Sequence, residues 1–144
     1  MRTVHVEEVV GLPIEAVFEL LADHADYDRL PGITKAELLR KGKEDRNGVG
    51  ALRRIHLGDV VLDEEIVAFD PPRRLEYRIV ASRPVRVDHK LGRVTLEPVG
   101  DSTRVTWTST FAVRFPLIGW FVTRRAAKQF ERGFHRVLRA LPSL

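Results

Sequence analysis

The sequence predicts an α+β fold: a seven-stranded curved antiparallel sheet around a long C-terminal helix, with two short helices after the first strand. Two observations lead to this prediction. The middle of the chain has almost only the alternation and turn residues of strands, and Leu117–Leu141 forms one long amphipathic segment. One helix cannot fill the whole inner side of such a sheet, so we also expect an internal cavity. With 144 residues, the chain 1–144 is expected to be a single domain.

The first strand and the first helix follow each other directly. Thr3–Val10 alternates as a strand does, and Pro13 suits the first turn of a helix because its missing N–H would have no partner there. Ile14–Leu21 then has its apolar residues at the spacing of one buried helix face. A second short helical turn is expected to end near Leu30, before a Pro-Gly turn.

Six more strands are bounded by glycine, proline, asparagine and aspartate. They are Ile33–Lys41, Ala51–Leu57, Val60–Phe69, Leu75–Ala81, Val85–Glu97 and Thr103–Phe115. Leu75–Ala81 has one apolar and one mostly polar face, so the sheet should be covered on one side only. In Val85–Glu97 the alternation slips by one residue at Gly92, which predicts a bulge there and a sharper bend of the sheet.

The C-terminal segment has separate apolar and basic residues. Its apolar residues at helical spacing are Leu117, Phe121, Ala126, Phe130, Phe134, Val137, Leu138 and Leu141. Its basic residues lie mainly elsewhere and are Arg124, Arg125, Lys128, Arg132, Arg136 and Arg139. Such a basic face is usually solvated, and this is our expectation; contact with an anionic membrane, or with a protein or ribosome, is the alternative.

Composition excludes several classes of function. The net charge is +4 and the pI about 9.8, but acids and bases are interleaved, and no basic cluster with stacking aromatics or recognition helix occurs, so we expect no nucleic-acid partner. Without cysteine, and with five histidines lacking paired metal spacing, no metal or cofactor is expected. No membrane-length apolar run or signal-peptide core is present, so we expect a cytoplasmic protein. We also expect a monomer or a homodimer.

Several short motifs, in order along nearly the whole chain, carry a family resemblance. They are Pro13–Asp23, Tyr27, Leu30–Ile33, Gly48–Ala51 with Arg53, Glu64-Glu65, Asp70–Leu75 with Tyr77, and Thr103–Trp107. Together they resemble the polyketide cyclase/dehydrase-type branch of the START-like (SRPBCC, Bet v 1-like) superfamily. The resemblance implies a helix-grip fold with a hydrophobic cavity. It implies no catalytic residues, because members include lipid and hormone binders, quinone-binding proteins and aromatase/cyclases.

Two charged or titratable residues are expected to face the cavity. His89 is in phase with Val87 and Leu91, where an imidazole could act as a general acid or base, hydrogen-bond a ligand carbonyl, or simply be a core histidine. Arg53 alternates with Ala51 and Ile55, and a buried guanidinium needs an acidic partner.

That acidic partner of Arg53 is Glu64 or Glu65, and alternation does not distinguish them because both phases of the strand mix acids with apolar residues. An arginine here could orient an anionic or carbonyl-bearing ligand, but an inter-strand ion pair is the interpretation we favour.

Hydroxyl and aromatic side chains complete the expected cavity lining. The candidate ligand-binding residues are Arg53, Glu65, Tyr77, His89, Trp107, Ser109, Phe111 and Phe130. We expect a non-catalytic binder or carrier of a small hydrophobic molecule such as a lipid, a quinone or a polyketide-like compound. The alternative is a cyclase or dehydratase, with His89 as acid or base and Arg53 stabilising enolate charge.

Overall fold

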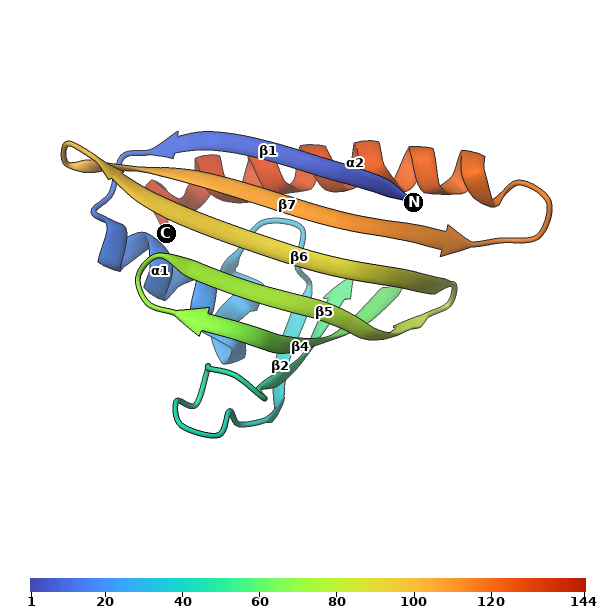
Figure 1. Ribbon diagram of the computed structural model, residues 1–144, viewed down its shortest axis with the longest axis horizontal. Coiled ribbons are helices and arrows are strands. Elements are labelled where there is room, and N and C mark those ends of the chain that lie inside the picture. The colour runs from blue at the N-terminus through green and yellow to red at the C-terminus, as the bar shows by residue number, and fades with distance from the viewer.

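The computed structural model, which describes residues 1–144, has the fold that the sequence predicts (Figure 1). Seven strands and a long C-terminal helix are present, and two short helices follow the first strand. The elements are β1 (Arg2–Val10), α1 (Ile14–Ala22), the 3-10 helix η1 (His24–Arg29), β2 (Lys35–Arg40), β3 (Leu52–Leu57), β4 (Val60–Asp70), β5 (Arg74–Arg83), β6 (Arg86–Val99), β7 (Ser102–Arg114), α2 (Gly119–Ala140) and the 3-10 helix η2 (Leu141–Ser143).

All neighbouring strands are antiparallel, in the order β1-β7-β6-β5-β4-β3-β2. From β2 to β7 each strand pairs with the next one in sequence, as hairpins do. Only β1 pairs at long range, for example with Val6 opposite Trp107. This pairing brings the N-terminal strand beside β7, and α2 packs across the inner side of these two strands.

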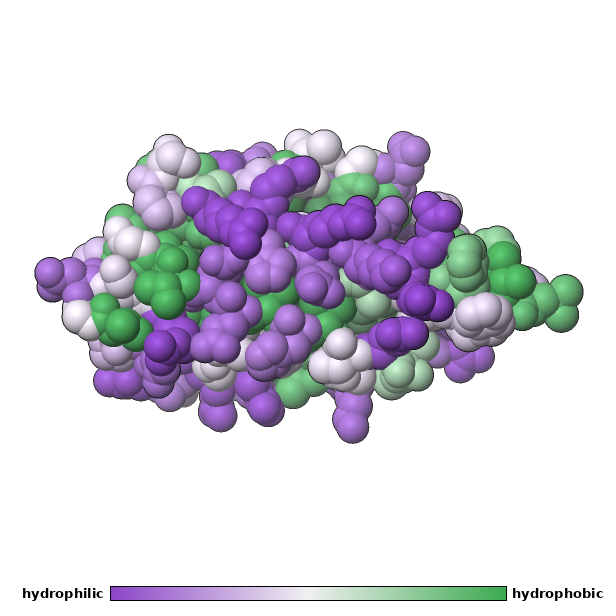
Figure 2. All heavy atoms as spheres, turned by 90° about the horizontal axis from the view of Figure 1, so that it is seen from above, coloured by the Kyte–Doolittle hydropathy of each residue, from purple (hydrophilic) through white to green (hydrophobic).

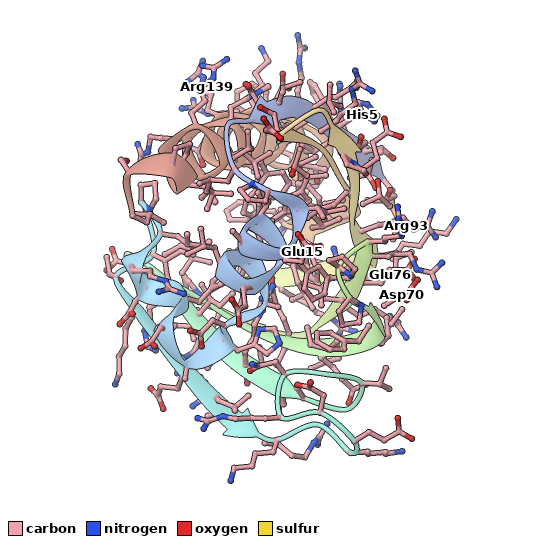
Figure 3. The ribbon with its side chains drawn as sticks, turned by 90° about the vertical axis from the view of Figure 1, so that its left-hand side faces the viewer. His5, Glu15, Asp70, Glu76, Arg93 and Arg139 are labelled. Atoms are coloured by element: carbon pink, nitrogen blue, oxygen red, sulfur yellow. The ribbon has the colours of Figure 1, made fainter.

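The remaining inner side of the sheet is closed by the N-terminal helices. Val17, Phe18 and Leu21 form the buried face of α1, as the helical spacing predicts. Seen end-on, α1 fills the opening at one end of the curved sheet (Figure 3). On the outer side of the sheet, Arg93 and Glu76 point to solvent and form an ion pair of 2.6 Å. The sheet is therefore covered on one side only.

The predicted bulge lies two residues earlier than the sequence indicates. His89 pairs with Phe111 and Leu91 pairs with Thr110, so Lys90 is the extra residue. Leu91 consequently belongs to the outer phase instead of sharing the inner phase of His89. Gly92 returns to the inner side, where the Tyr77 ring occupies the space of a side chain: a Cβ on Gly92 would lie 2.2 Å from Tyr77 Cζ. The glycine is required by this ring, not by the bulge.

The C-terminal helix begins later than its apolar pattern suggests. Leu117 and Phe121 belong to the predicted buried face, but Leu117 is 97% exposed and Phe121 42%. The physical reason is that β7 ends at Arg114, so the first turn of α2 extends past the sheet. From Thr123 onward one face of the helix packs against the sheet, and its buried residues are Thr123, Ala127, Val137 and Leu138. No helix of the protein combines the length and the apolar character that crossing a bilayer requires.

Substitution of Gly92 tests the packing against Tyr77. Gly92→Ala should lower the free energy of unfolding by about 1–3 kcal/mol, because the ring must move away from the new methyl group. Gly133→Ala is the matched control: it lies inside α2 with no atom near the new Cβ, so it should raise stability by about 0.5–1 kcal/mol. Urea unfolding measures both. Equal effects of the two substitutions on stability would contradict the close packing of the Tyr77 ring against Gly92.

Candidate ligand pocket

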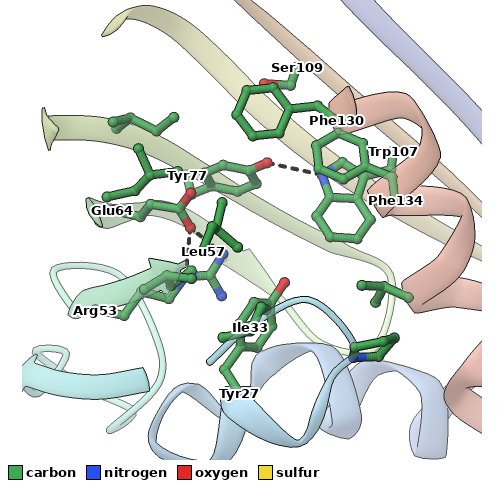
Figure 4. Close-up of a pocket in the computed structure, with 16 residues that line it drawn as sticks. Tyr27, Ile33, Arg53, Leu57, Glu64, Tyr77, Trp107, Ser109, Phe130 and Phe134 are labelled. Atoms are coloured by element: carbon green, nitrogen blue, oxygen red, sulfur yellow. Dashed lines mark hydrogen bonds and ion pairs between the residues drawn. The ribbon is translucent and has the colours of Figure 1, made fainter. Parts of the chain in front are cut away.

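A mainly apolar pocket of about 90 Å³ lies between α2 and the inner faces of β3, β4 and β5, with η1 beside it (Figure 4). Its lining residues are Tyr27, Pro31, Ile33, Arg53, Ile55, Leu57, Leu62, Glu64, Tyr77, Ile79, Trp107, Ser109, Phe130, Gly133, Phe134 and Val137. Of the candidate residues named from the sequence, five line this pocket: Arg53, Tyr77, Trp107, Ser109 and Phe130.

Arg53 is held at the pocket wall by an ion pair with Glu64. Its side chain is 1% exposed, and its Nε and Nη2 lie 2.9 and 2.7 Å from Glu64 Oε1. Its Nη1 donates to Nδ1 of His24 at 3.1 Å. Since Nδ1 accepts, His24 carries its proton on Nε2 and donates it to the Asn47 carbonyl at 2.8 Å. The guanidinium is thus fixed by a carboxylate on one side and a neutral imidazole on the other.

The acid that faces the pocket is Glu64, which corrects the assignment of Glu65 to the ligand-binding set. Arg53 and Glu64 are direct cross-strand neighbours between β3 and β4. Glu65 points to the outer side, where it pairs with Arg40 at 2.7 Å. Strand register decides between the two acids, and register is set by the whole hairpin instead of by local alternation.

Two tyrosine rings lie against the Arg53 guanidinium. Its carbon atom Cζ is 4.4 Å from the ring centre of Tyr27 and 5.3 Å from that of Tyr77, so cation–π attraction supports the buried charge. Burial raises the pKa of both phenols, and the Glu64 carboxylate raises that of Tyr77 further. Both rings therefore carry hydroxyl groups, not phenolates, at neutral pH.

His89 stands behind the pocket instead of lining it, which corrects its assignment as a ligand contact. Its Nδ1 accepts from the Ile79 N–H at 2.9 Å, and its Nε2 lies 3.0 Å from Ser109 Oγ. Regular pairing of β5 with β6 ends at Tyr77 opposite Gly92, so the imidazole replaces a backbone acceptor for Ile79. Burial, with the charge of Arg78, lowers the pKa of His89 to about 4. The proposed acid or base role has no support in this geometry.

The donor directions leave two hydroxyl hydrogens free. Trp107 Nε1–H can only donate, and it does so to Tyr77 Oη at 3.0 Å. Neutral His89, accepting at Nδ1, donates from Nε2 to Ser109 Oγ. The O–H hydrogens of Tyr77 and Ser109 therefore have no protein acceptor. Glu64 Oε2 likewise takes no protein hydrogen bond, since both Arg53 contacts fall on Oε1. Tyr27 also lines the pocket, and its hydroxyl hydrogen likewise has no protein acceptor. The pocket thus offers three hydroxyl donors and one carboxylate acceptor within mainly apolar walls.

Aromatic rings from α2 and β7 form the opposite wall. Trp107 and Phe134 stack with ring centres 4.0 Å apart, and Phe130 lies 6.1 Å from Phe134. Phe111 is not in the wall, which corrects its assignment: it lies behind Phe130, edge to face at 5.1 Å. Phe130 and Phe134 are half-buried and lie one helical turn apart on α2.

Sequence reasoning missed several pocket residues. Tyr27 and Ile33 come from η1 and the connection after it, where no strand alternation exists to assign a direction. The apolar spacing of the C-terminal segment includes Phe134 and Val137, and it could have placed both beside Phe130. His24 gave no signal, since its partners Arg53 and Asn47 come from distant parts of the chain. No group of three or more histidine or acidic side chains is placed to hold a metal ion.

Breaking the buried ion pair should be costly. Glu64→Gln leaves the Arg53 charge buried without a counter-charge, so we expect a loss of about 3–5 kcal/mol in the free energy of unfolding. Glu65→Gln, on the neighbouring residue, breaks only the exposed pair with Arg40 and should cost about 0–1 kcal/mol. Chemical denaturation of both variants is the measurement. A Glu65 variant as unstable as the Glu64 variant would contradict the assignment of the inward acid.

Stability should fall in acid because two histidines are buried neutral. Burial lowers the pKa of His24 to about 3 and of His89 to about 4, from an ordinary value of 6.5. The unfolded chain therefore binds more protons below pH 6.5. Stability is complete above that pH and is lost as the pH falls towards the folded values, by about 1.4 kcal/mol per pH unit for each histidine.

The pH effect is measured by urea unfolding between about pH 7 and about pH 5. His89→Gln should lower the pH dependence of the free energy of unfolding by the contribution of one histidine. His5→Gln, at an exposed position on β1, is the control for loss of an imidazole. A slope left unchanged by His89→Gln would show that the acid sensitivity arises elsewhere.

The comparisons with solved structures agree with this architecture. A START superfamily protein from Mycobacterium smegmatis has a TM-score of 0.79 at 16% identity, with 96% of this chain and 94% of that chain covered. A protein from Thermus thermophilus has a TM-score of 0.79 at 21% identity, covering 97% and 94%. The Zhui aromatase/cyclase from Streptomyces sp. R1128 has a TM-score of 0.80 at 22% identity, covering 97% and 90%. At these identities the likeness shows a shared fold.

A search of curated proteins finds no match. The family model described as polyketide cyclase / dehydrase and lipid transport, in contrast, matches residues 1–144. Since this match covers the whole chain, and the START-like helix-grip fold around an internal pocket agrees with it, the protein belongs to the polyketide cyclase/dehydrase and lipid transport family.

Proposed function

We propose that the protein binds or carries a small hydrophobic molecule that has a carbonyl oxygen. The observation that carries this proposal is the pair of free hydroxyl hydrogens, on Tyr77 and Ser109, in a pocket whose walls are mainly apolar. A buried donor without an acceptor favours a ligand that provides one. A carbonyl oxygen accepts hydrogen bonds without bringing a charge into the pocket, so it suits these two donors.

Glu64 adds a second preference. Its Oε2 faces the same pocket without a protein donor, so a hydroxyl group on the ligand would be bound there. A free carboxylate on the ligand would be repelled, because the Arg53 charge is already neutralised by Glu64. A neutral molecule with a carbonyl and a hydroxyl or phenol group fits these contacts best.

Pocket size limits the ligand. The volume of about 90 Å³ is well below the roughly 300–1,000 Å³ of pockets for drug-sized molecules. A one-ring or short-chain molecule matches a pocket of this volume. A polycyclic polyketide-like ligand would require the half-buried Phe130 and Phe134 to turn outward.

The second candidate is a cyclase- or dehydratase-type enzyme that uses this pocket. The observation in its favour is that a carboxylate, Glu64, faces the same pocket as the donors Tyr77 and Ser109. Glu64 would remove a proton next to the carbonyl, and the two hydroxyls would stabilise the resulting enolate oxygen. The resemblance to an aromatase/cyclase agrees with this reaction class. We favour the binder, because Glu64 is already engaged by the Arg53 guanidinium through two contacts to its Oε1.

A pair of isosteric probes tests the carbonyl preference. Acetophenone and α-methylstyrene have the same shape, and only acetophenone has a carbonyl oxygen. We expect the protein to bind acetophenone about fivefold more tightly, the contribution of one net hydrogen bond. Tyr77→Phe keeps the ring over Gly92 but lacks the hydroxyl, and should reduce the ratio towards one. Titration followed by the fluorescence of Trp107, which lines the pocket, gives both affinities.

The ratio of affinities is used because a general loss of stability changes both affinities alike. Ser102→Ala, at the start of β7 and away from the pocket, is the control and should leave the ratio unchanged. Native mass spectrometry of freshly purified protein should also detect a bound small molecule. If neither probe binds and no molecule co-purifies, the proposal is wrong. Turnover of a ketone substrate that Glu64→Gln abolishes would favour the enzyme.

A further inference from the structure

An exposed apolar tip connects β7 to α2. It consists of Phe115, Leu117, Ile118, Trp120 and Phe121, of which Leu117 is 97% and Trp120 70% exposed. In the space-filling view this tip is the hydrophobic end that projects beyond the polar band of the molecule, at the side where β7 turns into α2 (Figures 1 and 2). Scattered exposed apolar residues are ordinary, but five within seven positions of one projection mark an interaction surface.

The main chain holds this tip in a defined shape. Thr123 Oγ1 accepts from the Val113 N–H at 2.9 Å and donates to the Gly119 carbonyl at 2.7 Å, which joins the end of β7 to the start of α2. Leu117 has φ +66, a left-handed conformation that leucine rarely adopts. The side chain gains no packing in return, since it is almost fully exposed. The fold therefore presents Leu117 outward without benefit to the isolated chain.

Unpaired basic residues follow directly behind the tip. Arg124 and Arg125 lie one helical turn after Trp120 and Phe121, on the same faces of α2. Both are exposed, and neither takes part in any ion pair of the structure. The same is true of Lys128 in the next turn, and Glu131 is the one acidic residue within α2.

We propose that this tip docks the protein onto the surface of a bilayer that contains anionic lipids. Leucine, isoleucine and aromatic side chains would enter the interface between headgroups and acyl chains, where tryptophan is favoured. Arg124 and Arg125, one turn further back, then lie at the depth of the phosphate groups and attract negatively charged lipids. The order of apolar tip followed by basic residues matches the order of layers in such a membrane surface.

A second copy of the chain fits this surface less well. In a two-fold symmetric contact the same patch meets itself, so the unpaired arginines of both copies would gather at one interface. The tip is also a narrow projection, whereas a stable dimer buries about 800 Å² on each partner. The docking proposal does not depend on the pocket or on the proposed ligand.

Vesicle binding tests the proposal with the full chain. The protein should co-sediment with vesicles of phosphatidylcholine and phosphatidylglycerol, bind vesicles of phosphatidylcholine alone much more weakly, and dissociate as salt is raised. Leu117→Ser/Trp120→Ser should weaken partitioning at least about tenfold. Arg124→Gln/Arg125→Gln should weaken it roughly thirtyfold, about fivefold for each charge.

Two controls separate the tip from charge and apolarity in general. Lys43→Gln/Arg46→Gln removes the same net charge from the exposed loop between β2 and β3. Val99→Ser removes an exposed apolar side chain at the opposite end of β6. Both control variants should bind vesicles like the unaltered protein, and thermal unfolding establishes that all variants fold.

Trp120 gives a direct readout, since the chain has two tryptophans and Trp107 is buried. In a Trp107→Phe background, emission from Trp120 should shift to shorter wavelength with anionic vesicles and be quenched by brominated acyl chains. Absence of binding to anionic vesicles overturns the proposal, as does equal binding by the tip variant. A concentration-dependent dimer that the tip variant loses, without vesicle binding, would assign the surface to a second copy instead.

Discussion

The inner side of a seven-stranded sheet is wider than one helix, and the rest of this structure depends on how the difference is filled. α2 packs on β1 and β7, while α1 and η1 close one end. Between them remain the inner faces of β3, β4 and β5, which receive a buried ion pair, two tyrosines and a small pocket. The pocket and its polar groups are thus consequences of the same geometric mismatch.

Groups that can only donate hydrogen bonds determine which polar atoms of the pocket stay free for a ligand. The Arg53 guanidinium, the Ile79 N–H and the Trp107 indole fix His24, His89 and Tyr77 in turn. His24 gives its hydrogen to the Asn47 carbonyl, whereas Trp107 and His89 leave the hydroxyl hydrogens of Tyr77 and Ser109 without a protein acceptor at the pocket. The two histidines accept hydrogen bonds as neutral imidazoles. Their pKa values are low because both side chains are buried.

One helix contributes to two separate surfaces. The second half of α2 provides Phe130 and Phe134 to the pocket, and its first turn, beyond the end of β7, provides Trp120 and Phe121 to the apolar tip. Phe121 of the tip and Phe130 and Phe134 of the pocket belong to a single apolar pattern in the sequence, which does not reveal where the sheet beneath the helix ends. The distinction between core and exposed surface along α2 is made by the length of β7, a separate element.

The order and type of the elements, and the inward phase of Arg53, Tyr77, Trp107 and Ser109, can be predicted from the sequence, because alternation within a strand and helical spacing are local properties. Three features cannot be predicted in this way: Glu64 and not Glu65 contacts Arg53, Lys90 forms the bulge, and His89 donates to Ser109 from behind the pocket. These outcomes depend on the register between strands and on partners distant in the chain. Interactions of that kind are fixed when the whole sheet closes around α2.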